Sequence, residues 1–212
     1  MFLSSLILNP RSKAARRDMH DVYEMHRTLM SALPGKDDGG AGLMLWRLDT
    51  DRRSGISRVL VQSEKSPDWG KVTTSSPDYL ATDCPEGILP MQTKPLPELH
   101  FQNGQLLVFR LRANPTVKRE GKRHGLLTED EQTAWLNRKA ESHGFRLASL
   151  TVTPEQAAES SNGNGRRLKF VSALFEGRLI VTQPEDFRVK TLASGIGSAK
   201  AFGFGLLSVA RV

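Results

Sequence analysis

The sequence predicts an α+β protein made of two tandem ferredoxin-like (RRM-like) βαββαβ domains. Three observations indicate this fold class. The chain has 212 residues, which is enough for two small domains. Its first half reads as strand, helix, strand, strand, the opening of a split βαβ unit, and its second half reads as helix, strand, strand, helix, strand. No sequence repeat relates the halves, so the expected domains, 1–113 and 114–212, depend on element order alone.

The first half begins with an apolar strand at 2–8, which Asn9 and Pro10 end. A basic connector follows. Asp21 then begins a helix, and Glu24 three places later completes a capping-box pattern. Apolar residues recur at helical spacing along this element. This apolar stripe consists of Val22, Met25, Leu29 and Leu33.

Two strands at 42–49 and 57–63 come next, joined by a polar turn that contains Gly55. Residues 64–104 are rich in proline and show no pattern of a long helix. We therefore expect a loop-rich segment there, with short pieces of structure. A strand at 105–112 then ends the first domain.

The second half opens with an exposed basic hairpin or loop at 116–127, around Gly121. Thr128 and Glu131 fit a second capping box, which begins a helix that stops at Gly144.

A strand at 145–153 follows this helix, and a flexible turn ending in SSNGNG comes after it. Residues 167–183 read as a hairpin that turns at Glu176 and Gly177. A helix beginning at Pro184 and a last strand at 206–212 complete the predicted order.

The charge balance indicates an anionic partner. Thirty Lys and Arg against 23 Asp and Glu give a net charge of +7 and a pI near 9.8. A surplus of this size favours nucleic acid or an anionic membrane. The apolar start lacks a preceding basic residue, and no stretch approaches the ~18 apolar residues needed to cross a bilayer. We therefore expect a soluble, cytoplasmic protein with no membrane partner.

Several kinds of site are disfavoured. Cys84 is the only cysteine, which excludes an internal disulfide and a multi-cysteine metal site. His20, His100 and His143 are scattered and lack carboxylates at ligand spacing, so no metal is expected. No Walker loop or dinucleotide fingerprint is present, and no cofactor is predicted.

The first candidate site lies on the predicted helix after Asp21. Tyr23 and His26 are three residues apart, so the phenol and the imidazole are neighbours on the helix surface. An imidazole exchanges protons near neutral pH, and a phenol can donate a hydrogen bond or hold the imidazole in place. With cations to neutralise phosphate charge, these groups can cleave RNA without a metal ion. The competing interpretation is an ordinary polar helix surface. The cations are Arg16, Arg17 and Arg27.

The second candidate is a concentration of positive charge at 109–125. Arginines two apart on a strand share a face, and a basic loop could enter an RNA groove; the alternative is a solvated loop. His124 lies among cations, which disfavour its protonation, and we treat it as a bystander. The cations are Arg110, Arg112, Lys118, Arg119, Lys122 and Arg123.

The third candidate is the glycine-rich stretch SGIGSAKAFGFGLL at 194–207. Exposed amides beside Lys200 could hold a phosphate, whereas the alternative is a tight turn that lets the last strand pack. The stretch only partly imitates the aromatic strand of RNA-recognition modules, so Phe202 and Phe204 are not predicted to stack on bases. The glycines are Gly195, Gly197, Gly203 and Gly205.

Taken in order, several blocks resemble the CasE family, the CRISPR-associated endoribonucleases of the type I-E Cascade complex. They are LNP, YEMH, LRANP, GKR, AWL-x-RK, FEG-x-L and the terminal GIG-x-AK-x-x-G-x-GLLS-x-A. The likeness runs from the first strand to the last and is weakest across 64–104 and 150–165.

This resemblance implies two ferredoxin-like domains, metal-independent cleavage at the 3′ base of a CRISPR repeat stem-loop, and continued binding of the crRNA 3′ hairpin among other Cascade subunits. The family's catalytic histidine and tyrosine fall on His26 and Tyr23, and its glycine-rich signature falls on 195–205. Ser31 matches no family active-site residue. Whether His26 is general base or acid stays open. Two other classes remain: a stem-loop-binding subunit without catalysis, and a basic scaffold that contacts only protein.

Overall fold

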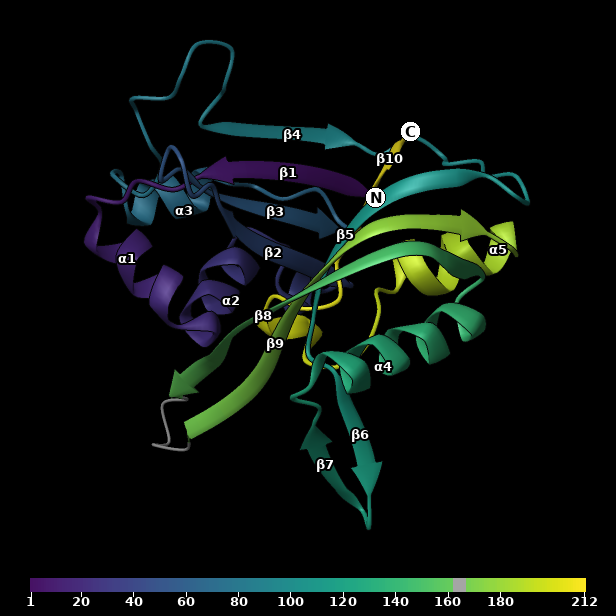
Figure 1. The fold of residues 1–212 in the computed structure, drawn as a ribbon. Helices are drawn as coiled ribbons and strands as arrows, with labels where there is room; N and C mark the ends of the chain where they lie inside the picture. Colours follow the sequence, from purple (N-terminus) through teal and green to yellow (C-terminus); the bar gives the residue numbers. More distant parts are fainter. Residues whose placement is uncertain (162–166) are drawn as a thin grey trace. The chain divides into compact units, whose positions relative to one another are not determined.

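The chain divides into two compact units, each built on its own four-stranded antiparallel sheet (Figure 1). A computed structural model describes residues 1–161 and 167–212. The first unit contains Met1–Pro97, together with Glu159–Leu168 and Ala201–Gly203. The second contains Glu98–Ala158, Lys169–Lys200 and Phe204–Val212. The first long segment therefore ends at Pro97, whereas the sequence predicted a boundary after residue 113.

The sheet of the first unit has the strand order β2-β3-β1-β4, and its neighbouring strands pair antiparallel. This is the order of a ferredoxin-like fold, in which the first strand lies between the third and the fourth. One face carries the apolar side chains that pack with three helices, α1 (Lys13–His20), α2 (Val22–Ser31) and α3 (Gly70–Ser75). The strands are β1 (Phe2–Ile7), β2 (Met44–Thr50), β3 (Ser57–Ser63) and β4 (Met91–Pro95).

The basic connector expected after the first strand is in fact a helix, α1 (Lys13–His20). Ser12 caps it by accepting a hydrogen bond from the Ala15 amide at 3.4 Å. Ala15 and Asp18 are buried, so this helix packs against the core despite its high charge. The helix α2 (Val22–Ser31) follows at once, because Asp21 ends α1 and also caps α2.

The segment 64–104 holds more regular structure than its composition indicates. It contains the short helix α3 (Gly70–Ser75) and the strand β4, which pairs with β1 at the edge of the sheet. Every residue of β4 is exposed, so it carries no apolar alternation that could predict it. A short 3₁₀ turn, η1 (Lys36–Asp38), precedes β2.

The strand predicted at 105–112 is present but belongs to the second unit, which corrects its assignment to the first domain. The second sheet has the order β10-β5-β9-β8, which repeats the ferredoxin-like pattern. The helix α4 (Glu129–Ser142) begins with the expected capping box of Thr128 and Glu131. The strands are β5 (Leu106–Ala113), β8 (Phe145–Ser161), β9 (Arg167–Val181) and β10 (Leu207–Arg211).

The predicted hairpin turn at Glu176 and Gly177 is wrong, because β9 runs through both residues. A Cβ on Gly177 would lie 2.1 Å from the Ser149 carbonyl oxygen, so glycine there permits a close approach between β8 and β9. The predicted flexible turn that ends in SSNGNG falls largely on 162–166, outside the described residues.

The predicted basic hairpin is confirmed as β6 (Thr116–Arg119) and β7 (Lys122–Gly125). Glu120 and Gly121 join the strands, both with positive φ, as a type I′ turn requires. The helix expected at Pro184 comprises α5 (Pro184–Asp186) and the π-helical η2 (Phe187–Ala193), and a 3₁₀ turn, η3 (Lys200–Phe202), precedes β10. Across the described ranges, none of the helices has the length and apolarity to span a bilayer.

Candidate active site and nucleic-acid interface

The helix α2 holds Tyr23 and His26 at the edge of the first unit's core. Asp21 fixes the start of the helix by accepting hydrogen bonds from the Tyr23 amide at 2.8 Å and the Glu24 amide at 3.4 Å. Met25 and Leu29 are completely buried and anchor one face. Tyr23 and His26 are both half-buried and lie one turn apart beside that face.

The imidazole of His26 is partly shielded from water. Its Nδ1 atom is buried and has no hydrogen-bond partner among the described residues. Burial lowers the pKa of His26 below its usual value of 6.5, because desolvation disfavours the charged imidazolium. The ring is therefore mainly neutral at pH 7, which is the state that can accept a proton.

The ring of Phe202 lies beside His26, with 6.4 Å between the ring centroids and 51° between the planes. Phe202 belongs to the segment Ala201–Gly203, which is part of the first unit. The sequence does not predict this neighbour, because 175 residues separate the two positions along the chain and no local pattern connects them.

Two of the three arginines expected to neutralise phosphate charge beside this site, Arg17 and Arg27, are engaged in ion pairs. Arg17 contacts the buried carboxylate of Asp18 at 2.7 Å and lies 3.4 Å from Glu24. Arg27 contacts the other oxygen of Glu24 at 2.8 Å. Arg16 is exposed and supplies the carbonyl that pairs with the His20 ring. The positive charge of Arg17 and Arg27 is therefore largely balanced within the unit.

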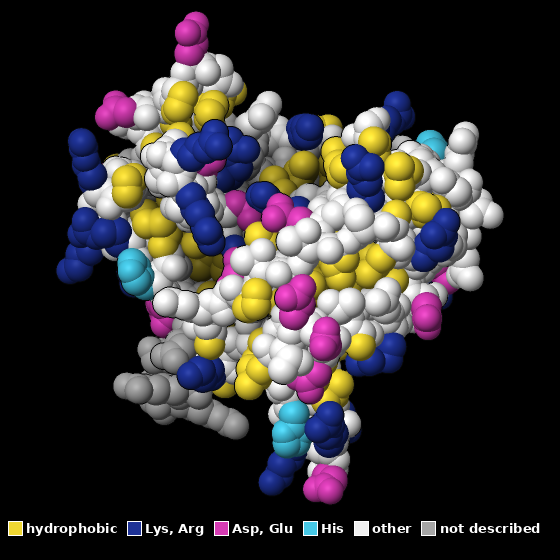
Figure 2. Space-filling model, in the orientation of Figure 1, with side chains coloured by type: hydrophobic (Ala, Val, Ile, Leu, Met, Phe, Trp, Pro, Cys, Tyr) yellow, Lys and Arg dark blue, Asp and Glu magenta, His cyan; other side chains and the backbone are white. Residues whose placement is uncertain are grey.

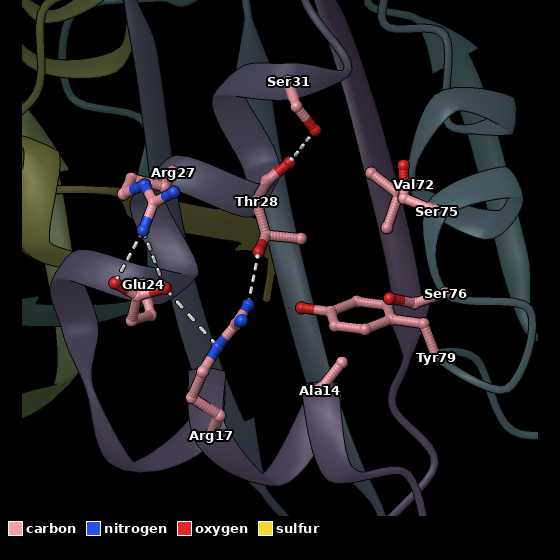
Figure 3. A pocket seen from close by; sticks show the side chains of 10 residues that line it. All are labelled: Ala14, Arg17, Glu24, Arg27, Thr28, Ser31, Val72, Ser75, Ser76 and Tyr79. Atoms are coloured by element: carbon pink, nitrogen blue, oxygen red, sulfur yellow. Dashed lines mark hydrogen bonds and ion pairs between the residues drawn. The ribbon is translucent and has the colours of Figure 1, made fainter.

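Arg17 and Arg27 also line a pocket of about 270 Å³ where α1, α2 and α3 meet (Figure 3). Thr28 and Ser31 line the same pocket, together with Tyr79. At 100° per residue, Thr28 and Ser31 lie on the flank of α2 away from His26. The pocket is therefore a separate feature from the surface that carries the imidazole.

Tyr79, which lines this pocket, makes a buried hydrogen bond. The Tyr79 hydroxyl donates to Asp18 Oδ2 at 2.9 Å, and both residues are 1% exposed. Burial raises the pKa of Tyr79, and the charge of Asp18 reinforces the shift, so the phenol remains protonated. Tyr79 thus acts as a fixed donor that helps to hold α1 in place.

The hairpin β6–β7 carries four of the predicted RNA-binding cations in the second unit. Cross-strand register places Lys118 opposite Arg123 and Arg119 opposite Lys122. All four are exposed, and Figure 2 shows Lys and Arg side chains gathered on this hairpin. Like charges directly opposite each other destabilise a hairpin. The four cations therefore do not serve the stability of the hairpin.

The two predicted cations on β5 are paired within the second sheet. Arg110 contacts Glu176 at 2.7 Å, and Arg112 contacts Glu155 through two of its nitrogens at 2.7 Å each. Ser172 also donates to Glu155, at 2.6 Å. These arginines therefore have a structural function in the sheet, in contrast to the cations of the hairpin.

Two glycines of the glycine-rich stretch do not offer exposed amides. Gly195 and Gly205 are buried, and their amides donate to the carbonyls of Thr191 and Arg112 at 3.0 and 2.8 Å. Gly197 lies against the Trp135 ring, where a Cβ would be 3.1 Å from the nearest atom. These three glycines thus fit the alternative interpretation of a tight turn, while a phosphate-binding loop around Lys200 stays a prediction.

Lys200 is the one predicted cation in this stretch. It is partly exposed, and burial together with the nearby charge of Lys139 lowers its pKa. His143 lies in the same region, and its pKa is lowered by burial, with further contributions from Lys139, Lys200 and Lys190. Within the described ranges, no group of three or more His, Cys, Asp and Glu is placed to hold a metal ion.

The chain is similar to known proteins along nearly its whole length. A family model described as CRISPR associated protein matches residues 1–211. The CRISPR-associated endoribonuclease Cse3 of Thermus thermophilus is 40% identical over 99% of this chain and 100% of its own length. The Cascade subunit CasE of Escherichia coli is 30% identical over 99% of both chains. A structure of CRISPR endoribonuclease Cse3 bound to a 19-nucleotide RNA superimposes with a TM-score of 0.81 at 39% identity, covering both chains completely. The chain therefore belongs to the family of CRISPR-associated proteins that includes Cse3 and CasE, as the ordered sequence blocks predicted.

Proposed function

We propose that this protein is an endoribonuclease that binds the stem-loop of a CRISPR repeat RNA and cuts at its 3′ base. The observation that carries the proposal is the half-buried His26, with its lowered pKa and with Tyr23 one turn away, in a chain 40% identical to a named endoribonuclease. The reaction is attack by the ribose 2′-hydroxyl on the adjacent phosphorus. It leaves a 2′,3′-cyclic phosphate and a 5′-hydroxyl and needs no metal ion.

His26 is the proton-transfer group in this proposal. A neutral imidazole can take the proton of the 2′-hydroxyl as it attacks, and an imidazole with its Nδ1 turned into the protein offers Nε2 to the substrate. The lowered pKa of His26 favours the role of general base over that of general acid at pH 7. Proton transfer of this kind typically contributes about 10²–10⁴-fold to a rate.

Tyr23 is the second group in this proposal. Its phenol lies on the same side of α2 as the imidazole, one helical turn earlier. It can donate a hydrogen bond to the reacting phosphate or orient the ribose. In this proposal the phenol contributes through its position and a hydrogen bond and does not serve as a proton acceptor.

The hairpin β6–β7 holds the RNA in this proposal. Its four cations face one another across the strands, an arrangement that an anionic partner stabilises. Arginine and lysine contacts to phosphates provide sequence-independent, salt-sensitive affinity. Further candidate contacts to the RNA phosphates come from Lys200, Arg16 and Arg27. We expect a smaller contribution to RNA affinity from the arginines that are held in ion pairs, Arg110, Arg112 and Arg17.

The proposal also assigns partners and a location. The cut repeat stays bound as the 3′ hairpin of the crRNA, and the protein assembles with other Cascade subunits, as the name of the E. coli relative states for that protein. The proposed location is the cytoplasm, where a repeat transcript is available.

The test is a cleavage assay on the repeat RNA in the presence of EDTA. Wild-type protein should cut once at the base of the stem. His26→Ala should lose about 10²–10⁴-fold in rate while keeping its RNA affinity. Tyr23→Phe should lose less. His20→Ala is the matched control, because His20 is an exposed histidine on the neighbouring helix. This variant should cleave at the wild-type rate. A 2′-deoxyribose at the cut site should abolish cleavage.

Two results would reject the proposal. If His26→Ala cuts as fast as wild type, the imidazole is not the proton-transfer group. If wild type binds the stem-loop tightly but leaves it intact, the protein is the RNA-binding subunit without catalysis.

A further inference from the structure

The segment Ala201–Gly203 is fixed to the first unit by Trp46 on β2. The indole Nε1 of Trp46 donates a hydrogen bond to the Ala201 carbonyl at 3.1 Å. Gly203 has a φ of +83°, and a Cβ there would lie 2.8 Å from the Trp46 ring. Trp46 itself is 2% exposed, so its indole is a rigid support. The segment therefore has little freedom to move away from β2.

This fixed segment presents Phe202 to His26. The two ring centroids are 6.4 Å apart and tilted by 51°, a range in which aromatic rings are in contact. Nδ1 of the imidazole is buried and lacks a partner among the described residues, so this side of the ring is shielded from water. Trp46, the segment and Phe202 thus form a continuous support that ends at the imidazole.

We propose that Phe202 is a positioning residue for His26, whose aromatic ring holds the imidazole in one orientation and keeps water from its buried side. This inference rests on the proposed function, because it concerns the histidine that the proposal uses. It assigns a function to Phe202 other than base stacking. It also explains why a glycine is needed at 203, one residue after the aromatic side chain.

Burial accounts for the lowered pKa of His26, and among the described residues no charged group contributes to the shift. The support itself is uncharged, since Trp46 and Ala201–Gly203 bear no titratable side chain. On α2, the titratable neighbours are Tyr23 and Arg27, and the charge of Arg27 is paired with Glu24. Removing the Phe202 ring should therefore raise the pKa of His26 toward 6.5 by hydration alone.

The test compares Phe202→Ala with Phe202→Leu. The pKa of His26 is measured by NMR titration of its ring protons, with His26→Gln to assign the signal, and cleavage rate is measured against pH. Phe202→Ala should raise the pKa of His26 and shift the rise of the cleavage rate to higher pH by the same amount. Phe202→Leu, which retains an apolar side chain, should restore most of the wild-type profile.

The matched control is Phe101→Ala in the second unit. Phe101 is a half-buried aromatic residue whose ring lies 5.0 Å from that of Phe187. This variant should lose stability without changing the pKa of His26. If Phe202→Ala does not fold, Trp46→Phe serves instead, because it keeps an aromatic core residue but removes the hydrogen bond to Ala201. It should raise the pKa of His26 in the same direction.

The outcomes separate this inference from the proposed function. An unchanged His26 pKa in Phe202→Ala, or in Trp46→Phe where it is used, overturns the positioning role. A raised pKa with an unshifted cleavage profile means that Phe202 packs on His26 but that His26 is not the titrating catalytic group, which rejects the proposed function. A change in both confirms that the aromatic support acts through the imidazole.

Discussion

The two units share a sheet order but differ in what they insert after their first strand. In the first unit, β1 leads into α1 and α2, and α2 carries His26 and Tyr23. In the second, β5 leads into the hairpin β6–β7 before α4 begins. Each unit thus has four strands in the equivalent order. The segment after the first strand holds the candidate catalytic residues in the first unit and the exposed cations in the second.

The charges of the two insertions are arranged in opposite ways. Around α2, Arg17 and Arg27 are matched by Asp18 and Glu24, so the cations stabilise the unit itself. On the hairpin, cations face cations across the strands. A balanced set of charges fixes the position of a helix, whereas an unbalanced set needs an external anion. We therefore expect variants of the first insertion to affect catalysis or stability, and variants of the second to affect RNA affinity.

Among variants outside the catalytic pair, the largest expected effect is on RNA affinity, and it tests the second insertion. Replacing Lys118, Arg119, Lys122 and Arg123 together with Ala should weaken stem-loop binding by about 100- to 1000-fold and reduce the salt slope of log K by about 3–4. The reason is the loss of up to four phosphate contacts. Binding measured across a salt series would check both numbers.

The control for the hairpin variant removes the same net charge from the first unit. Lys36, Arg52, Arg53 and Lys65 are exposed, and their joint replacement by Ala should change affinity by less than about 10-fold. Equal losses in the two variants would mean that net charge, and not the hairpin, determines affinity.

The next effect is on stability, and it tests the contact between Trp46 and the segment Ala201–Gly203 that places Phe202 beside His26. Gly203→Ala should destabilise the protein by about 2–3 kcal/mol, because alanine is strained at a φ of +83° and its Cβ would contact the Trp46 ring. Gly104→Ala in the second unit is the matched control, with a φ of +85° and no atom within 4 Å of the added Cβ. It should cost about 1 kcal/mol. Urea unfolding of both variants separates backbone strain from the clash; equal losses would leave no effect of the Trp46 contact.

A third, smaller difference lies in one hydrogen-bonded acid of each unit, Asp18 and Glu155. Tyr79→Phe should cost about 1–2 kcal/mol, because Asp18 is buried and loses a donor that solvent cannot replace. Ser172→Ala in the second unit should cost about 0.5–1 kcal/mol, because Glu155 is partly exposed and keeps two bonds from Arg112. Thermal unfolding measures both, and a larger loss for Ser172→Ala would contradict this ranking.

Local sequence signals predicted the elements that depend on local chemistry. Asp21 and Thr128 begin helices because a side-chain oxygen satisfies nearby amides, and that pattern is visible in the sequence. Ser12 gives the same signal before α1, but the charged residues after it concealed the helix. The exposed strand β4 lacks alternation, and β5 was assigned to the wrong sheet because a strand's sequence does not identify its partner.

The candidate site was predictable to a similar extent. Tyr23 and His26 could be placed on one helix because three-residue spacing is a local property. The contact of Phe202 with His26 depends on Trp46 and on the path of the chain through Gly203, which only the folded structure brings together. Likewise, Arg110 pairs with Glu176 on the neighbouring strand β9, and Arg112 pairs with Glu155 on β8, two strands away. These ion pairs reduce the number of cations in this stretch that are available to bind RNA.

The smallest expected effect distinguishes the two half-buried histidines by salt. The pKa of His26 is lowered by burial alone, whereas that of His143 is lowered by burial and also by Lys139, Lys200 and Lys190. Salt screens the cations but does not hydrate a buried ring. Raising NaCl from ~50 to ~500 mM should therefore raise the pKa of His143 and leave that of His26 unchanged.

NMR titration of both ring signals measures this difference directly. Since each folded-state pKa lies below the unfolded value, both histidines destabilise the fold as pH falls through 6.5 toward the folded pKa. Added salt should lessen that acid-side loss in His26→Gln, where His143 alone remains of the pair, more than in His143→Gln. If the pKa of His26 also rises with salt, unpaired cations act on its imidazole, and the contrast between a balanced first insertion and an unbalanced second one fails at the catalytic residue itself.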